Sequence, residues 1–120
     1  MAHTITLLGD HKGYTRSRVN GAEYVVDAAI DITTYDSAGD VGELITASEL
    51  GLSSITAVES TGQEAVNGIA AIRTDSSGDY ESSSSFKILF LQPSATPQLL
   101  EEEADDTNIG IVRVRAYGNL

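Results

Sequence analysis

The stretch EYVVDAAIDI, residues 23–32, decides the fold class because its apolar residues recur with a period of two. An extended chain sends successive side chains to opposite faces, so this pattern is typical of a β-strand with one buried face and one solvated face. Asp27 and Asp31 fall on the solvated face. The buried face would hold Tyr24, Val26, Ala28, Ile30 and Ile32. We therefore predict a strand at residues 23–32.

Two other segments also read as strands. SFKILFLQ, residues 85–92, is apolar on both faces, which is typical of a central strand that is covered on both sides. IGIVRVRAY, residues 109–117, sends Val112, Val114 and Ala116 one way and its arginines the other, as in a half-buried strand. Weaker strand candidates are residues 4–8, 13–19, 53–60 and 68–74.

One short helical turn is predicted near residues 46–51. Thr46 and Glu49 have the spacing of a capping box, and Gly51 tolerates the left-handed conformation that ends a helix. A helix this short is unstable alone, so tertiary packing must hold it. We expect it to close one end or edge of the β-structure with the apolar residues that flank it, which are Leu44, Ile45, Leu50, Leu52 and Ile55.

The segments between the strands carry turn and loop signals. Asn20-Gly21 favours a tight hairpin, and the polar residues 74–85 read as a surface loop. Residues 92–108, QPSATPQLLEEEADDTN, contain both prolines and five acids within six positions. These acids would repel one another in a buried site, so we predict a long, solvent-facing connection between the last two strands.

Seven strands and one helical turn predict an all-β fold, an antiparallel β-sandwich or barrel. The 120 residues fit a single domain. Within it we expect an N-terminal arm with the first strands at residues 1–20 and a β-sandwich body at residues 21–120. The arm carries three basic residues against one acid, and the body carries four against 17. Either the basic arm docks on an acidic surface, or the difference is a chance fluctuation.

Composition excludes several classes of function. A net charge of −11 argues against nucleic acid as a partner, because affinity for phosphates comes largely from Lys and Arg. Cysteine is absent, so disulfides and thiolate metal sites are excluded. The apolar runs are too short to span a membrane, and MAHTITLLGD lacks the features of a signal peptide. We expect a soluble protein made in a cytoplasm, without a membrane partner.

No set of residues predicts catalysis, a cofactor or a metal ion. His11 follows Asp10 directly, but neighbours in a strand point to opposite faces, and no nucleophile motif accompanies them. The acids of residues 31–43 and 101–106 do not have the spacing of a calcium-binding EF-hand loop. We expect solvated acidic surfaces at both places, with a loop-bound calcium ion as the alternative.

Basic residues within the predicted strands are the candidates for a protein interface. Arg113, Arg115 and Tyr117 share one face of the last strand, and Arg and Tyr are enriched where proteins meet. Two interpretations remain open, since these arginines could instead pair with acids of the same chain. The candidate interface residues are Lys12, Arg16, Arg18, Arg113, Arg115 and Tyr117.

The order of these features resembles small virion proteins of tailed bacteriophages, of the head decoration or cement type. A strand ending in DITTYDSAGDVGE is followed by a Thr-capped turn closing on Leu50-Gly51-Leu52, then SSITAVES, and the chain ends in the arginine-bearing strand VRVRAYGNL. The resemblance covers most of the chain. It implies a β-rich protein, a homotrimer, bound in many copies to the major capsid protein on the outside of the phage head.

The sequence thus predicts a non-enzymatic structural protein of the virion. Two alternatives are a neck or tail component and a receptor- or sugar-binding β-sandwich displayed on the virion. Sugar-binding modules usually stack sugars on exposed aromatic rings, and this chain has no Trp, five Tyr and two Phe. That composition disfavours the sugar-binding alternative.

Overall fold

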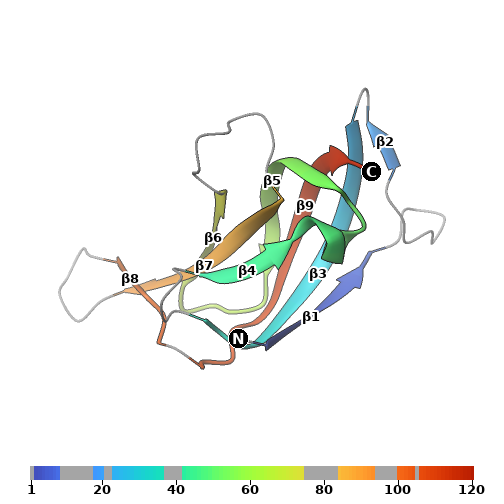
Figure 1. Cartoon of the computed structure of the whole chain (residues 1–120). Coiled ribbons are helices and arrows are strands. Elements are labelled where there is room, and N and C mark those ends of the chain that lie inside the picture. The colour runs from blue at the N-terminus through green and yellow to red at the C-terminus, as the bar shows by residue number, and fades with distance from the viewer. Residues whose placement is uncertain are drawn as a thin grey trace.

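A computed structural model of the chain describes residues 2–8, 18–20, 23–36, 42–74, 84–93, 100–104 and 106–120. These residues form an all-β sandwich of two antiparallel sheets with one helical turn (Figure 1). The predicted fold class is confirmed. None of the helical residues in these ranges forms a segment long and apolar enough to cross a membrane.

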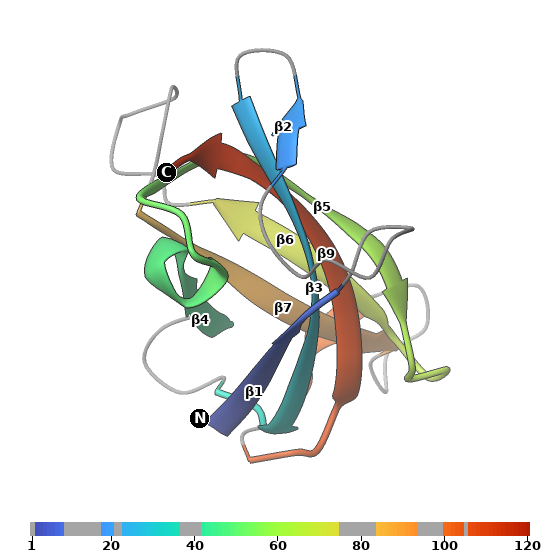
Figure 2. The same ribbon diagram turned by 90° about the vertical axis from the view of Figure 1, so that its right-hand side faces the viewer.

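The first sheet has five strands in the order β1-β3-β9-β5, with β2 added on β3. Its longest strand is β3, Glu23–Thr34, which pairs with β9, Gly110–Asn119, along nine positions. Both strands are long and curved, and they lie side by side through the molecule (Figure 2). The remaining strands are β1 Ala2–Leu7, β2 Arg18–Asn20 and β5 Ser54–Gln63.

The second sheet has four strands arranged around β7, Ser85–Pro93. β6, Ile69–Thr74, pairs with one side of β7. On its other side β7 pairs first with β4, Glu43–Thr46, and then with β8, Leu100–Glu102. The predicted central position of residues 85–92 is therefore correct.

The core lies between the two sheets and is built from the alternating apolar residues of their long strands. Ile30 and Ile32 of β3 are fully buried, as is Ile88 of β7. Burial of each such side chain contributes about 1.5–3 kcal/mol. The core residues of the three strands with the clearest sequence patterns are Val26, Ala28, Ile30, Ile32, Phe86, Ile88, Phe90, Val112, Val114 and Ala116.

The predicted helical turn is a 3₁₀ helix, η1, Ala47–Leu50. Thr46 precedes it, and Gly51 ends it with a left-handed φ of 77°. Leu50 and Leu52 pack into the core with 1% and 4% exposure, as expected of a turn that closes the sandwich. Leu44 differs from the expectation: it is 42% exposed, because alternation along β4 turns it away from the buried Ile45.

Two short strands were not predicted. β4 has four residues and β8 has three, too few for a period of two to stand out. β8 lies inside residues 92–108, which we expected to be a connection without strands. The hairpin at Asn20 is present as the pairing of β2 with β3, while Gly21 and the predicted loop residues 75–83 lie outside the described ranges.

The second face of β7 also departs from the prediction. Phe86, Ile88 and Phe90 are buried against the first sheet, whereas Lys87, Leu89 and Leu91 on the opposite face are only partly buried. The apolar pattern on both faces predicted cover on both sides. Only one face of this strand is fully covered.

Candidate functional site

Arg115, one of the predicted interface residues, forms an ion pair within the chain. Its Nε lies 2.7 Å from Oδ1 of Asp27, and its Nη2 lies 3.2 Å from Oδ2. The two residues are register partners on β3 and β9, which brings them directly opposite each other. The hydrogen bonds to Asp27 raise the pKa of Arg115. For Arg115, this contact is the pairing with an acid of the same chain that the sequence analysis left open as an alternative to a protein interface.

Tyr117 is also engaged within the sheet. Its hydroxyl donates to Oε1 of Glu59 at 3.0 Å, from β9 to the neighbouring strand β5. Because this phenol already donates its proton to a carboxylate, it is less able to donate a hydrogen bond to a partner protein. Arg115 and Tyr117 therefore brace the five-stranded sheet.

Arg113 is in a different situation. It is exposed on the outward face of β9, and within the described residues no ion pair or side-chain hydrogen bond holds it. It borders a hollow of about 330 Å³ on the outer side of the five-stranded sheet. The other lining residues are Thr61, Gly62, Gln63, Glu64 and Ile111. Of the two candidate arginines on β9, Arg113 is therefore the one that, among the described residues, has no intramolecular partner and can contact another protein.

The other three candidates belong to the N-terminal twenty residues. Lys12 and Arg16 lie outside the described residues, as does His11. Arg18 begins β2, where its backbone pairs with Val25, and its side chain also lies outside the description. β1, by contrast, is fully part of the five-stranded sheet through its pairing with β3.

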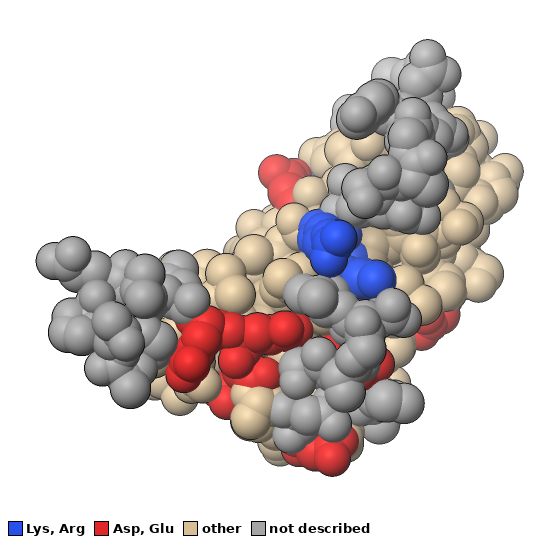
Figure 3. Space-filling view, turned by 60° about the vertical axis from the view of Figure 1, so that its left-hand side comes forward, with Lys and Arg blue, Asp and Glu red and all other residues tan. Residues whose placement is uncertain are grey.

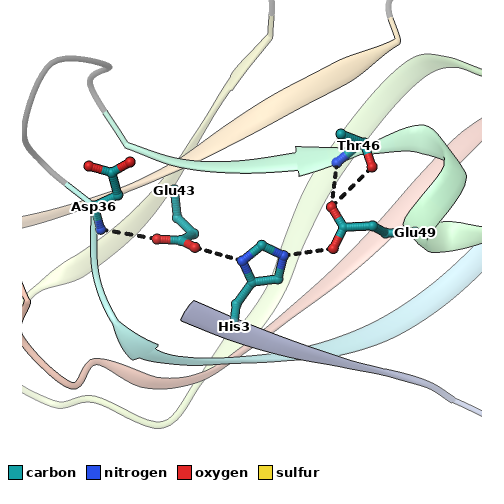
Figure 4. A network of polar contacts seen from close by, with 5 residues as sticks. All are labelled: His3, Asp36, Glu43, Thr46 and Glu49. Carbon is teal, nitrogen blue, oxygen red and sulfur yellow. Dashed lines mark hydrogen bonds and ion pairs between the residues drawn. The ribbon is translucent and has the colours of Figure 1, made fainter. Parts of the chain in front are cut away.

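His3, at the start of the chain, lies in a polar network that the sequence did not predict (Figure 4). Its Nδ1 is 2.6 Å from Oε2 of Glu43, and its Nε2 is 2.7 Å from Oε2 of Glu49. We call these three residues the His3 clasp. It links β1 of the five-stranded sheet to β4 and η1 on the side of the four-stranded sheet.

The geometry of the His3 clasp fits a protonated imidazole between two carboxylates. An imidazole can donate from both ring nitrogens only when it is positively charged. Burial alone would lower the pKa of His3, but its hydrogen bonds to Glu43 and Glu49 outweigh that cost and raise the pKa. Burial likewise opposes ionisation of Glu49, and the bonds from Thr46 and His3 outweigh it, so the pKa of Glu49 is lowered.

Glu43 is the buried member of the clasp, with 2% exposure. A buried carboxylate is costly unless it is paired and hydrogen-bonded. Here His3 supplies the opposite charge, and the backbone N–H of Asp36 donates to Oε1 at 3.0 Å (Figure 4). Glu43 was expected in a solvated acidic surface, and that expectation is wrong. The burial follows from alternation along β4, which turns Glu43 inward with Ile45.

Glu49 connects the clasp to the capping of η1. Its Oε1 accepts the backbone N–H of Thr46 at 3.1 Å and the Thr46 hydroxyl at 3.0 Å, while Oε2 accepts from His3. The capping residues could be read from the sequence because they are three positions apart. The link to His3 could not, because 46 positions separate the two residues.

Tyr35 is a second buried polar anchor. Its hydroxyl donates to Oε1 of Glu102 at 2.6 Å and accepts the backbone N–H of Phe90 at 3.0 Å. Burial, with the bond to Glu102, raises the pKa of Tyr35 well above its usual range. Glu102, expected to face solvent as part of the acidic run, is instead partly buried and tied to the core through this bond.

Within the described ranges, no group of three or more His, Asp and Glu side chains has an arrangement suited to a metal ion. Asp36 and Glu43, two of the acids weighed for calcium, do lie together. The two oxygens of Glu43 are already engaged, one by His3 and the other by the backbone N–H of Asp36. Oδ1 of Asp36 is buried and has no hydrogen-bond partner among the residues that the structure describes.

The outer face of the four-stranded sheet carries or adjoins most of the exposed large apolar residues that the structure describes. Three of the four large apolar residues that are exposed in the described ranges lie on it or beside it: Leu44, Val66 and Ile69, at 42%, 99% and 57%. Val66 and Ile69 border a hollow of about 570 Å³ that also includes Leu91 and Pro93. On this side of the molecule a basic patch lies close to an acidic band (Figure 3).

Comparison with known proteins gives no family. No family model, no curated protein and no solved structure matches the chain.

Proposed function

We propose that this chain is a non-enzymatic virion structural protein, a decoration or cement protein that binds the outside of a phage head. The proposal combines the resemblance in the order of sequence elements with one structural observation. Arg113 projects from the outer side of the five-stranded sheet beside Ile111 and a shallow hollow. An available arginine next to apolar area is the kind of group that anchors protein interfaces.

The partner in this proposal is the major capsid protein, and the contact is made through carboxylates of the capsid surface. A guanidinium bonds a carboxylate in bidentate fashion, as Arg115 does with Asp27 inside this chain. The remaining surface carries most of the net charge of −11 and would face solvent. The negative charge of this surface would repel the phosphates of the packaged nucleic acid.

A cement protein stabilises the shell by mass action. If it binds the assembled lattice and not free capsid subunits, the free energy of binding adds to the stability of the lattice. Such a protein needs a rigid body and a surface that spans neighbouring subunits. The His3 clasp and Tyr35 support the rigid body, because both tie strands of different sheets together.

The proposal is tested first by the location and copy number of the chain in purified virions, measured by electron cryomicroscopy. Many copies distributed over the head are expected. A single ring of copies at the neck would contradict a head location and assign the protein to the connector or tail.

A second test uses Arg113→Ala in a binding assay with purified, undecorated capsids. Loss of an interface arginine is expected to weaken binding about tenfold, which corresponds to about 1.4 kcal/mol. The matched control is Arg73→Ala, an exposed arginine on the other sheet. Equal capsid binding by the wild type and both variants would remove the role proposed for Arg113.

A further inference from the structure

β1 is bound to the sandwich less firmly than the strand beside it. Among the described strands it pairs with β3 alone, from Ala2 opposite Thr34 to Leu7 opposite Ala28 (Figure 2). Its inward side chains, Ile5 and Leu7, pack on the core but are only partly buried. β3, by contrast, also pairs with β9 along nine positions. Departure of β1 would therefore leave the pairing of β3 with β9 intact.

His3 occupies a position on β1 that alternation would give to an apolar side chain. It is the register partner of Ile32, which is fully buried, so both side chains point into the sandwich. The ring of His3 bonds Glu43 and Glu49 on the side of the other sheet (Figure 4). Within the described residues, these are the polar side-chain contacts that join β1 to β4 and η1.

The titratable groups around the imidazole are acids. Glu43 faces it from β4 and Glu49 from η1, and β3 places the apolar Ile32 opposite it. Asp36, just beyond β3, adds a third acid beside Glu43. None of the described Lys and Arg side chains bonds to either glutamate. The charge of the imidazolium is therefore the positive charge that these acids depend on.

We propose that His3 is a proton-controlled switch for β1. While the imidazole is charged, its two hydrogen bonds hold β1 against β4 and η1. When the imidazole loses its proton to solvent, one ring nitrogen presents a lone pair to a carboxylate, and both ion pairs are lost. β1 then separates from β3, while the rest of the sandwich stays folded. Separation uncovers the pairing edge of β3, whose backbone groups can then bind another strand.

The opening is local because of what β1 does and does not bury. A short edge strand with partly exposed side chains opens at a lower free energy than the strands of the core. Glu43 adds a second reason, since it is buried and costly without an opposite charge. Departure of β1 lets water reach this carboxylate and relieves that cost. The closed form is thus disfavoured once His3 is neutral, whereas the β3–β9 pairing is unaffected.

The direction of the switch follows from the clasp. Burial lowers the pKa of His3, but its bonds to the two glutamates outweigh burial and raise it. The closed form is therefore favoured below the ordinary value of 6.5, and this stabilisation is lost as pH rises through the folded-state pKa. We expect β1 to be docked in mild acid and open in mild alkali. This inference does not depend on the proposed function, because it concerns the free protein.

The test is hydrogen–deuterium exchange of the purified chain between about pH 5.5 and about pH 8.5. Rates are corrected for the intrinsic dependence of amide exchange on pH. The protection of the β1 amides, and of the adjoining Leu8 N–H that bonds to Asp27, should fall several-fold as pH rises. The amides of Val112 and Val114 in β9 should keep their protection.

Three variants connect this response to the clasp. His3→Gln carries no charge, so its β1 amides should exchange rapidly at every pH in the range. His11→Gln is the matched control, because it removes the other histidine of the chain and should keep the wild-type response. Glu49→Gln removes one carboxylate but keeps an acceptor for the Thr46 N–H, so opening should begin at lower pH. Circular dichroism establishes that the variants fold.

Several outcomes would overturn the proposal. One is protection of β1 that does not change with pH, and another is protection that falls equally in β1 and β9. A pH response that persists in His3→Gln, or that Glu49→Gln leaves at the same pH, would overturn it as well. Should His3→Gln not fold, the wild type and Glu49→Gln still decide. Capsids are absent from these experiments, so failure here is distinct from failure of the proposed function.

Discussion

Nδ1 of His3 lies 2.6 Å from Oε2 of Glu43, and this contact spans 40 positions of the chain and joins the two sheets. The second ring nitrogen reaches Glu49 at 2.7 Å. Among the described strands β1 lies at the edge of its sheet and pairs with β3 alone. The His3 clasp is therefore the polar link that holds the edge strand to η1 and β4.

The first prediction concerns removal of this link. His3→Ala leaves Glu43 buried without its opposite charge, and breaking a buried pair on one side typically costs several kcal/mol. Because His3 itself is partly exposed, we expect a loss of about 2–3 kcal/mol in the free energy of unfolding, measured by urea denaturation. Thr4→Ala is the control, since Thr4 is an exposed neighbour on β1. Equal losses for the two variants would show that the clasp contributes nothing.

The pH dependence of stability follows from the two pKa shifts in the clasp. The raised pKa of His3 gives stabilisation that is complete below the ordinary value of 6.5 and is lost as pH rises through the folded-state pKa. The lowered pKa of Glu49 gives stabilisation that is present above the ordinary value of 4.5 and is lost as pH falls through its folded-state pKa.

The difference in stability between the wild type and His3→Gln should therefore be largest between about pH 4.5 and pH 6.5 and should shrink at higher pH. Urea midpoints measured across the pH range test this, and NMR titration of the His3 ring gives its pKa directly. A His3 pKa below 6.5 in the folded protein would contradict the arrangement of an imidazolium between two carboxylates.

Tyr35 and Tyr117 provide a matched pair of hydroxyl groups. Tyr35→Phe removes the acceptor of the buried Phe90 N–H and the donor to Glu102, so we expect a loss of about 1–3 kcal/mol. Tyr117→Phe removes one exposed bond to Glu59 and should cost less than about 1 kcal/mol. Thermal or urea denaturation distinguishes the two. The reverse order would mean that the Tyr35 bonds do not hold the sheets.

Local patterns explain which parts of the fold could be predicted. Residues 23–32, 85–92 and 109–117 are long enough for a period of two to be visible, and they became β3, β7 and β9. The caps of η1 could also be predicted, because Glu49 and Gly51 lie only three and five positions after Thr46. Strands of three or four residues, such as β8 and β4, give no such signal.

The polar contacts were beyond a reading of the sequence because they depend on strand register. Arg115 meets Asp27 because antiparallel pairing of β3 and β9 places them opposite each other, across 88 positions. His3 meets Glu43 and Glu49 only after the two sheets pack. The sequence pattern of the last strand drew attention to Arg115 as a candidate interface residue. No local sequence pattern indicated a role for His3.

The last prediction compares two glycines that the fold uses for different reasons. Gly51 has a φ of 77°, and a Cβ added there would meet no atom within 4 Å. Gly51→Ala should therefore cost only the left-handed backbone conformation, about 1 kcal/mol. At Gly118 an added Cβ would lie 1.9 Å from the backbone oxygen of Ser54, where β5 and β9 pair. Gly118→Ala must push these strands apart and should cost about 3 kcal/mol or prevent folding. Denaturation of both variants tests the difference, and equal, small losses would mean that β5 and β9 do not approach as closely as described.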